Sequence, residues 1–499
     1  MIEKASYQNM FYVFSSLFMM KGRNTMKIVI IGGGIIGCFL AHDLSRYDVD
    51  ITLIERESDV CDEVSSANSA IIHAGYDPEE HTLKALLNKK GADMYPAICE
   101  QLNVDYKRIG AYVVAAGEEE EETLSILYER GTKRGIHMEW LTRDELLEKE
   151  PNISAQITKA LSVPDTAIIT PWEMGLTLIQ EAVCNGLSLK LEENVVDIKR
   201  NGKQFHVITD KAHYDADIVI NAAGLGSAKI MNMIEDTSLF DITPKRGQYF
   251  ILSKHATDFV KHVLYPVPGK AGKGVLCVPT CHGNILLGPN SEILEEQDNG
   301  TSAQGLKEVR EKLQKTVTNI PYGEIIHSYA GLRPCGNHND FFIQASPISQ
   351  NFIHLGCIDS PGLASAPAIS AYVIEQLILP QHVLKQKELY RHYKRITPMK
   401  DLSSQQKAER IKKQSAFGHI ICRCENISEQ EVVDCIHEPC GARTIKEIKK
   451  RIRPGMGKCQ GGFCEIEVAK ILARELHIPL AEVRYDKTSY FMTNKGVSK

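Results

Sequence analysis

Residues 27–56, KIVIIGGGIIGCFLAHDLSRYDVDITLIER, are the stretch around which the predicted fold is organised. The apolar, β-branched run 27–31 predicts a short buried strand. It leads into Gly32-x-Gly34-x-x-Gly37, in which the first glycine forms a tight turn, the second lets a pyrophosphate approach the backbone, and the third lets the next helix pack close to the sheet. Free N–H groups at the start of that helix favour phosphate anions. The pattern therefore predicts that the chain binds an adenine dinucleotide.

A second predicted strand covers residues 51–54, and Glu55 ends it. A carboxylate at this place, about 20 residues beyond the glycines, accepts hydrogen bonds from an adenosine ribose. Such an acceptor disfavours a ribose that carries a 2′-phosphate. The motif alone does not separate NAD from FAD.

The composition is that of an ordinary globular protein. The chain has 499 residues, of which 43% are hydrophobic and 24% charged, and at about 100–200 residues per domain it is long enough for two or three domains. The formal net charge of −5 gives no electrostatic reason to expect binding to nucleic acid or to an anionic membrane.

The cysteines fall into two classes. Four of the fourteen form a pattern near the C-terminal end, and the others are scattered. Since the chain shows no secretory signal, this distribution predicts a reducing, cytoplasmic compartment and a metal site rather than a disulfide scaffold.

Residues 1–25 stand apart from the predicted fold. Their apolar run, MFYVFSSLFMM, is too short to span a bilayer and lacks a small-residue cleavage site. We expect an extension or a mis-assigned start before Met26, with no transmembrane segment. A peripheral contact with a membrane surface is the alternative.

Beyond the first unit the pattern changes from parallel to antiparallel strands. Short alternating runs over residues 187–214 predict a three-stranded meander that returns to the parallel sheet at 217–225, DIVINAAGL. Residues 244–330 carry hairpin-like runs with glycine turns. Residues 401–416 are polar and lack apolar periodicity, which predicts a linker.

Two polar segments are expected near the ring end of the dinucleotide. The loop after the first unit carries Ser65, Ser66 and Asn68, and His73 follows. A small-residue helix begins near residue 362, and its first N–H groups would point at the polar edge of the cofactor ring.

Several segments, in this order, make the chain similar to a known family: the glycine motif, SSANSAIIHAGYD (65–77), INAAGLGS (220–227), PKRGQY (244–249), GKGVLCVPT (272–280), HGNILLGP (282–289), AGLRP (330–334) and IDSPGL (358–363). Residues 26–395 resemble the glycine- and D-amino-acid-oxidase superfamily of FAD-dependent oxidoreductases. They are most similar to the FAD-dependent glycerol-3-phosphate dehydrogenases and oxidases, and less closely to L-2-hydroxyglutarate dehydrogenase.

The resemblance implies an α/β fold with a Rossmann-like FAD-binding domain of the glutathione-reductase type, an antiparallel-sheet substrate domain and a small helical C-terminal iron–sulfur domain. The expected divisions are an extension (1–25), an oxidoreductase domain (26–395), a linker (396–416), an iron–sulfur domain (417–475) and a tail (476–499). Within the oxidoreductase domain, the FAD-binding parts cover about 26–108, 160–240 and 328–395, and the substrate-domain parts cover about 109–159 and 241–327.

The resemblance also implies which residues hold FAD. They are the glycine turn, the end of the second strand, the polar loop, and the ends of later strands: Gly32, Gly34, Ile36, Gly37, Glu55, Arg56, Ser65, Ser66, Asn68, Val195, Ala223, Gly224, Gly362 and Leu363.

His73 is the candidate catalytic base. Oxidation of a secondary alcohol requires removal of the hydroxyl proton while a hydride leaves carbon, and a histidine can accept that proton near pH 7. In related oxidases the histidine of this HAG motif is proposed for that role. A histidine that only hydrogen-bonds the cofactor or its loop is the alternative.

Arg333 is the candidate anchor for an anionic substrate, since a guanidinium can hold a phosphate or a carboxylate through two hydrogen bonds. Its place in AGLRP puts it on a predicted tight turn. Lys273 and Ser360 match family positions near the substrate. Lys245 and Arg246 are left unassigned, as cofactor-side or structural residues.

The patterned cysteines are Cys422-x-Cys424 and, after a helical segment, Cys459 and Cys464. Two close pairs can place four thiolates around one metal centre. The segment resembles the bacterioferritin-associated-ferredoxin-like domain, which implies a [2Fe-2S] cluster. Its second pair is C-x4-C where the small ferredoxin has C-x2-C, as in fused dehydrogenases. A structural zinc site is the alternative. The intervening cysteines, Cys435 and Cys440, are expected to serve packing.

Three functions follow. The first is oxidation of sn-glycerol 3-phosphate to dihydroxyacetone phosphate, with electrons leaving singly through the cluster to a partner protein or subunit. The second is oxidation of a 2-hydroxy acid, amine or amino acid, with Arg333 holding a carboxylate. In the third, the C-terminal domain is a docking or regulatory module and electrons pass elsewhere, for instance to O2.

Overall fold

The computed structural model describes residues 25–269 and 274–492. The predicted extension, apart from Thr25, lies outside the described residues. Across the part of the chain that the structure describes, no helix combines the length and apolar character needed to cross a bilayer.

The expected FAD-binding domain, called the FAD-binding domain below, is built on a six-stranded sheet in the order β20-β21-β13-β1-β2-β9. The strands are β1 (Lys27–Ile31), β2 (Asp50–Ile54), β9 (Ser188–Lys190), β13 (Ile218–Asn221), β20 (Phe342–Ser346) and β21 (Ser349–Gly356). All neighbours are parallel except β20 and β21. Buried apolar runs such as IVII suit a parallel sheet that is covered on both faces.

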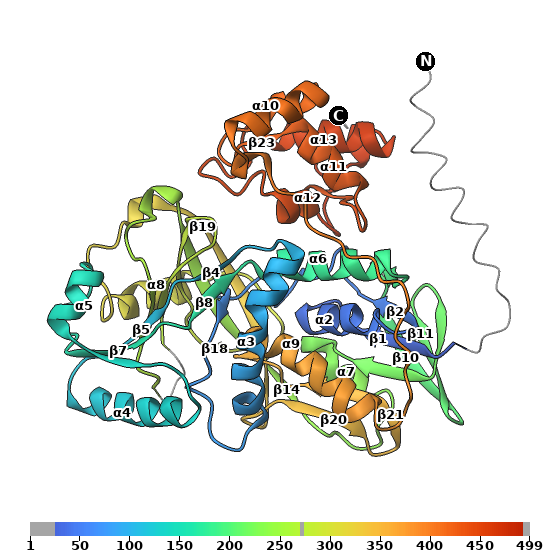
Figure 1. The fold of residues 1–499 in the computed structure, drawn as a ribbon, viewed down its shortest axis with the longest axis horizontal. Coiled ribbons are helices and arrows are strands. Elements are labelled where there is room, and N and C mark those ends of the chain that lie inside the picture. The colour runs from blue at the N-terminus through green and yellow to red at the C-terminus, as the bar shows by residue number, and fades with distance from the viewer. Residues whose placement is uncertain (1–24, 270–273, 493–499) are drawn as a thin grey trace, which may run out of the picture.

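Helices cover one face of this sheet and the meander covers the other (Figure 1). The helices are α2 (Ile35–Leu44), α3 (Leu83–Leu102), α6 (Pro171–Cys184) and α9 (Gly362–Tyr372), and the meander is β10 (Val195–Asn201), β11 (Gln204–Thr209) and β12 (His213–Ala216). At Gly91 in α3, an added Cβ would lie 2.2 Å from the carbonyl oxygen of Ala364 in α9, so glycine lets these two helices pack closely.

The substrate domain is a nine-stranded, mostly antiparallel sheet in the order β18-β14-β17-β16-β15-β5-β7-β6, with β19 also paired to β14. Its strands are β5 (Ala111–Ala115), β6 (Glu139–Thr142), β7 (Lys159–Val163), β14 (Ile242–Leu252), β15 (Val263–Pro266), β16 (Leu276–Pro279), β17 (Ile285–Gly288), β18 (Glu292–Ile293) and β19 (Ile325–Gly336). Helices α4 (Glu118–Lys133), α5 (Arg143–Lys149) and α8 (Ala303–Leu313) pack on it.

A small sheet joins the two domains. It consists of β3 (Ile71–Ile72), β8 (Ala167–Ile169) and β4 (Tyr106–Arg108). Strands β4 and β5 are separated at Gly110, which takes a positive φ of 71°, and the chain changes sheets there. The pairing of β3 with β8 places His73, directly after β3, at the junction of the two domains.

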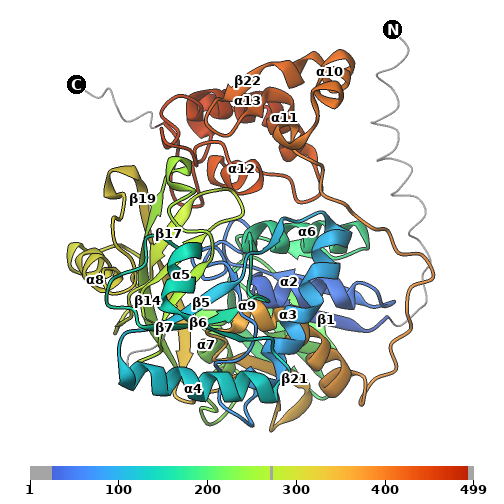
Figure 2. The same ribbon diagram turned by 60° about the vertical axis from the view of Figure 1, so that its left-hand side comes forward.

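The C-terminal domain has its own apolar core and lies over α6 (Figures 1 and 2). Its elements are β22 (Ile420–Cys422), β23 (Ile427–Ser428), α11 (Glu429–His437), α12 (Ile445–Ile452) and α13 (Glu465–Leu476). Because α12 contacts α6, even the polar residues Glu173, Thr177 and Gln180 of α6 are buried.

The structure adds a helix to one expected segment at the C-terminal end and corrects the extent of another. The expected linker contains helix α10 (Ser404–Lys413), because Ser403 and Gln406 form a capping box that supports a helix without an apolar face. The expected tail from residue 476 is part of the domain up to the end of the described residues: Val483 is buried in its core, and Arg484 pairs with Tyr490.

Candidate active site

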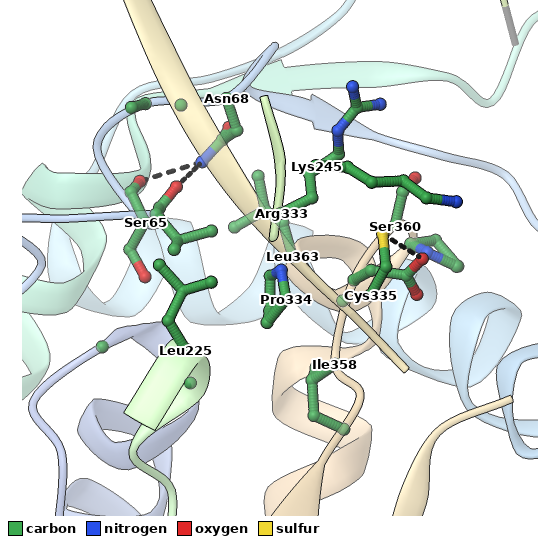
Figure 3. A pocket seen from close by; sticks show the side chains of 18 of the residues that line it. Ser65, Asn68, Leu225, Lys245, Arg333, Pro334, Cys335, Ile358, Ser360 and Leu363 are labelled. Carbon is green, nitrogen blue, oxygen red and sulfur yellow. Dashed lines mark hydrogen bonds between the residues drawn. The ribbon is translucent and has the colours of Figure 1, made fainter. Parts of the chain in front are cut away.

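A cavity of about 970 Å³ lies between the parallel sheet and the substrate-domain sheet. This volume is at the upper end of the usual range for ligand pockets. Most of the predicted site residues line it: Gly32, Gly34, Ile36, Glu55, Arg56, Ser65, Asn68, His73, Val195, Ala223, Gly224, Arg333, Ser360, Gly362 and Leu363. Figure 3 shows Ser65 and Asn68 on one side of it and Lys245, Arg333 and Ser360 across from them.

Three of the residues predicted to bind FAD or the substrate are not among the cavity-lining residues. Gly37 packs beneath the glycine turn, where an added Cβ would lie 2.0 Å from the carbonyl oxygen of Gly32. Ser66 donates its hydroxyl to the carbonyl of Glu63 and serves its own loop. Lys273 lies outside the described residues.

The glycine turn leaves room for a phosphate at the start of α2. Gly32 has a φ of 106°, and a Cβ there would lie 2.5 Å from the carbonyl oxygen of Ala222, so only glycine fits without strain. No side chain caps the helix at Gly34, where a Cβ would meet only the Ser65 hydroxyl at 3.4 Å. The positive end of the helix dipole therefore faces the cavity.

Glu55 joins the glycine turn to the loop that follows β2. Its carboxylate accepts the N–H of Gly33 at 2.6 Å and the N–H of Glu57 at 2.8 Å. Burial raises the pKa of Glu55, and these two backbone donors oppose that rise. The carboxylate lines the cavity, as a ribose acceptor must.

The polar loop is tied to α2 and to itself. The Ser65 hydroxyl oxygen accepts the N–H of Ile35 at 2.9 Å. The Asn68 side chain donates to the Ser65 carbonyl at 3.0 Å and accepts the N–H of Ala70 at 2.7 Å. These bonds fix the chain that leads to His73.

His73 is held from two sides. Its carbonyl accepts the side-chain N–H of Asn88 at 2.7 Å, and its Nδ1 lies 3.0 Å from the hydroxyl of Tyr265. Burial raises the pKa of Tyr265 far above its usual value, so the phenol stays neutral. If Nδ1 carries the ring proton and donates it to Tyr265, Nε2 is the acceptor atom of the ring. The sequence did not single out Tyr265.

Arg333 lies in the middle of β19 and not on a tight turn, because the run around it pairs with β14 along its whole length. Its Nη2 donates to the carbonyl of Asn290 at 2.9 Å, whereas its buried Nε has no hydrogen-bond partner. Lys245 is its direct cross-strand neighbour and also lines the cavity. Among the described residues, neither cation forms an ion pair with a carboxylate.

Arg246, the next residue along β14, has a structural role. Its side chain is buried and pairs with Glu292 at 2.9 Å and with Asp298 at 2.6 Å. Successive residues of a strand point to opposite faces, so Lys245 faces the cavity and Arg246 faces away from it. This alternation is the signal in PKRGQY that could have assigned both residues.

The four patterned cysteines form two pairs in the C-terminal domain. The Sγ atoms of Cys424 and Cys459 are 3.6 Å apart. Cys422 is hydrogen-bonded to Cys464 and to the backbone N–H groups of Glu425 and Gly455, which lower its pKa to about 6. Backbone N–H groups directed at sulfur stabilise thiolates, so the donor set suits an iron–sulfur cluster or zinc.

The other two cysteines of this domain serve packing, as expected. Cys435 is 2% exposed within the domain's core, and Cys440 packs against the core of the FAD-binding domain.

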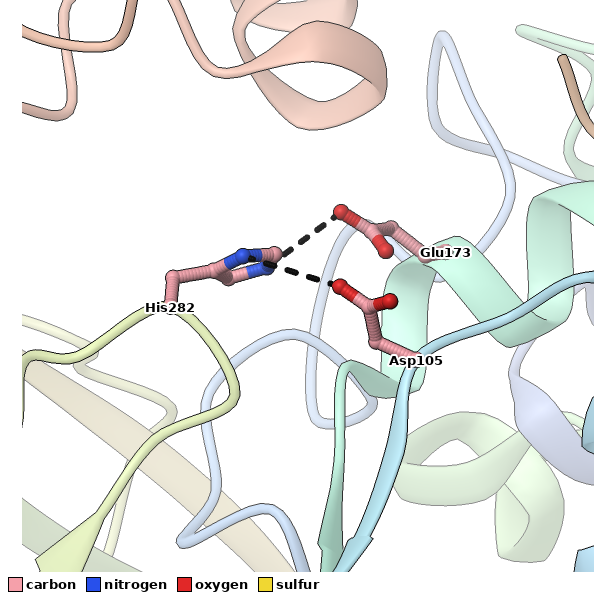
Figure 4. Close-up of side chains that lie close together, drawn as sticks. All are labelled: Asp105, Glu173 and His282. Carbon is pink, nitrogen blue, oxygen red and sulfur yellow. Dashed lines mark ion pairs between the residues drawn. The ribbon is translucent and has the colours of Figure 1, made fainter. Parts of the chain in front are cut away.

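A second cluster, which the sequence did not reveal, lies where the domains meet (Figure 4). His282 Nε2 is 3.4 Å from Glu173 and Nδ1 is 3.9 Å from Asp105. Burial raises the pKa of Glu173, but Arg395, whose guanidinium is 3.2 Å away, and His282 outweigh it, and the pKa is about 2. Since Arg395 already balances Glu173, this cluster is an ion-pair network and not a cation site.

Comparison with known proteins covers both parts of the chain. The model of the FAD dependent oxidoreductase family matches residues 27–376, and that of the BFD-like [2Fe-2S] binding domain matches residues 420–474.

A glycerol 3-phosphate dehydrogenase of Caloramator mitchellensis is 43% identical over 476 residues, which cover 95% of this chain and 99% of that protein. A glycerol 3-phosphate oxidase of Mycoplasma pneumoniae is 30% identical over 69% of this chain and 92% of its own length. The solved structure of the L-alpha-glycerophosphate oxidase from Mycoplasma pneumoniae with FAD bound has a TM-score of 0.71 and 27% identity, and covers 75% of this chain and 100% of that one.

Proposed function

The chain belongs to the FAD-dependent oxidoreductase family and carries a BFD-like [2Fe-2S] binding domain, and we propose that it oxidises sn-glycerol 3-phosphate to dihydroxyacetone phosphate. The observation that carries the proposal is the similarity to a glycerol 3-phosphate dehydrogenase over 95% of the chain, both domains included. The chemistry of the cavity supports it.

The cavity suits FAD. The start of α2 and the open space at Gly34 would hold the pyrophosphate, and Glu55 would accept the ribose hydroxyls. The start of α9, at Gly362, lies at the same cavity and would meet the polar edge of the ring. Bound FAD supplies a hydride acceptor and can release its electrons one at a time.

His73 would act as the general base. It is the histidine that lines the cavity, and its Nδ1 contact with Tyr265 orients the ring. With Nδ1 protonated, Nε2 would take the proton of the substrate's secondary hydroxyl as the hydride leaves the same carbon. Tyr265, buried and neutral, would position His73 without exchanging a proton itself.

Lys245 and Arg333 would bind the substrate's phosphate. Like charges directly opposite each other on antiparallel strands destabilise a sheet. A phosphate dianion relieves that repulsion more fully than a single carboxylate, and it would also satisfy the unpartnered Nε of Arg333. This pair therefore favours glycerol 3-phosphate over a 2-hydroxy acid. Ser360 lines the same cavity and offers a hydroxyl to the substrate.

The electrons would leave through the C-terminal domain. Cys422, Cys424, Cys459 and Cys464 would hold the [2Fe-2S] cluster, which carries one electron at a time to an acceptor protein or subunit. We also propose that the protein works in the cytoplasm, where thiols stay reduced, because none of the fourteen cysteines, all of which lie in the described part of the chain, forms a disulfide.

Anaerobic mixing of the purified protein with one substrate at a time tests the proposal. Glycerol 3-phosphate should bleach the flavin absorption, whereas L-2-hydroxyglutarate and an amino acid at the same concentration should not. Bleaching by L-2-hydroxyglutarate alone would replace the proposed substrate with a carboxylate. No bleaching by glycerol 3-phosphate would overturn the proposal.

A further inference from the structure

The loop that follows β2 lies between the cofactor cavity and the C-terminal domain. We name residues 55–65 the cavity loop; it contains neither helix nor strand, and most of its residues line the cavity. Its inner side is bonded to the glycine turn: Glu55 accepts the N–H of Gly33 at 2.6 Å, and the N–H of Cys61 donates to the Gly33 carbonyl at 2.8 Å. Its position therefore decides the shape of the nucleotide end of the cavity.

The C-terminal domain contacts the middle of this loop through buried ion pairs and hydrogen bonds. Arg451 donates to the Asp59 carboxylate through both Nη atoms, at 2.7 and 3.2 Å. Lys450 donates to the carbonyl of Val60 at 2.7 Å and lies 3.1 Å from Asp59. Asp59, Lys450 and Arg451 are each no more than 5% exposed. Paired in this way the charges are satisfied, but any one of them alone would be a buried unpaired charge.

Two more contacts hold the ends of the loop. Lys446 lies 3.0 Å from Asp62, which lines the cavity. Lys487 donates to the carbonyl of Arg56 at 2.7 Å and lies 3.6 Å from Glu57. The cavity loop is thus bonded to the C-terminal domain at its start, its middle and near its end.

We propose that the C-terminal domain has a second function, as a clamp that completes the FAD site by holding the cavity loop against the glycine turn. FAD in the cavity and the C-terminal domain meet at the same loop, so the binding of one orders the surface that meets the other. The coupling is reciprocal: docking of the domain tightens FAD binding, and bound FAD stabilises the docked domain. The inference rests on FAD as the cofactor and not on the identity of the substrate.

The test uses the full-length protein and two partly exposed lysines, chosen because their removal leaves no buried charge unpaired. The double variant Lys446→Ala and Lys487→Ala is compared with wild type and with Lys470→Ala, a lysine of the same domain that pairs with Glu467 within α13. FAD is removed, and its rebinding is followed by the change in flavin fluorescence.

The double variant should bind FAD roughly tenfold more weakly, and the control should bind it as wild type does. In addition, FAD should slow the loss of iron to a chelator in wild type and in the control, and should do so less in the double variant. A role in packing alone would lower the melting temperature and leave the affinity for FAD unchanged. An unchanged dissociation constant in the double variant would overturn the proposal, whether or not glycerol 3-phosphate bleaches the flavin.

A second variant, Arg451→Met, changes a buried residue of the same contact and provides an independent measurement. It should weaken FAD binding more than the lysine pair does, with the far-ultraviolet circular dichroism of the folded chain retained. Folded protein with the wild-type affinity for FAD would also contradict the clamp.

Discussion

The cofactor cavity and the interface between the FAD-binding and C-terminal domains differ in whether their charged side chains are paired. In the cavity, Lys245 and Arg333 lie opposite each other without a carboxylate partner among the described residues. In the interface, Asp59 meets both Lys450 and Arg451, and all three are buried. A site that binds an anion leaves cations unsatisfied until the ligand arrives, whereas an interface neutralises its charges within the protein.

The largest expected effect is that removal of one cysteine abolishes the cluster while the chemistry in the cavity continues. Cys424→Ser deletes one thiolate of the expected cluster, and Cys424 is exposed, so the fold should tolerate the change. We expect total loss of the cluster's visible absorption, with flavin bleaching by substrate retained. Iron analysis and the visible spectrum measure this. A protein that keeps its cluster bands would remove Cys424 from the ligand set.

Within the cavity, His73→Ala should have the largest effect on the chemistry. Loss of a general base typically slows a reaction by about 10²–10⁴-fold. The rate of anaerobic flavin reduction should fall within this range while the bound FAD content stays the same. Tyr265→Phe, which removes only the contact to Nδ1, should have a smaller effect of about tenfold. Flavin reduction at the wild-type rate in His73→Ala would refute the base assignment.

Acid should remove the stabilisation that the ion pair of Glu173 and Arg395 gives to the folded chain. Burial raises the pKa of Glu173, but Arg395 and His282 more than offset this, and the pKa is about 2 in the folded chain. Since that value lies below the unfolded value of about 4.5, the stabilisation is complete above pH 4.5 and is lost as the pH falls towards 2, a contribution of about 3 kcal/mol.

Denaturant unfolding at several pH values, with Glu173→Gln as the comparison, measures this contribution. The free energy of unfolding of wild type should fall more steeply below pH 4.5 than that of the variant. Parallel curves for the two proteins would show that Arg395 and His282 do not hold Glu173 ionised.

The smallest expected effects distinguish the two cations of the cavity. Arg333→Met should raise the KM for glycerol 3-phosphate roughly 30-fold or more, because it removes the guanidinium that can hold the phosphate through two hydrogen bonds and leaves only the single ammonium of Lys245. Lys245→Met should raise it roughly tenfold, as one charge of the pair remains. Arg246→Met, on the opposite face of β14, is the control and should affect stability instead of KM. An unchanged KM in both cavity variants would place the phosphate elsewhere.

Much of the fold was predictable because its signals are local. The glycine turn between β1 and α2, the meander over β10–β12 and the two cysteine motifs, C-x-C and C-x4-C, each lie within a short window of sequence. The mistakes have physical causes. Capping by Ser403 supports a helix that apolar periodicity does not reveal, and pairing with β14 extends the run around Arg333 into a long strand.

The interface was not predictable from the sequence. Asp59 and Arg451 are 392 residues apart, and neither belongs to a recognisable motif. Charged residues in such segments are usually solvent-exposed, and only the docking of one domain on the other buries these. Likewise, the role of Lys245 becomes visible only when β14 and β19 are paired and Arg333 is placed opposite it.

An anaerobic titration with glycerol 3-phosphate, followed both by flavin absorption and by the paramagnetic signal of the cluster, tests the central claim most directly. The account predicts that about 1.5 equivalents of substrate fully reduce the protein. Each substrate molecule supplies two electrons, FAD takes two, and a [2Fe-2S] cluster takes one. The flavin should bleach and the cluster signal should appear in the same titration. Bleaching that ends at one equivalent without a cluster signal, or the absence of bleaching, would contradict it.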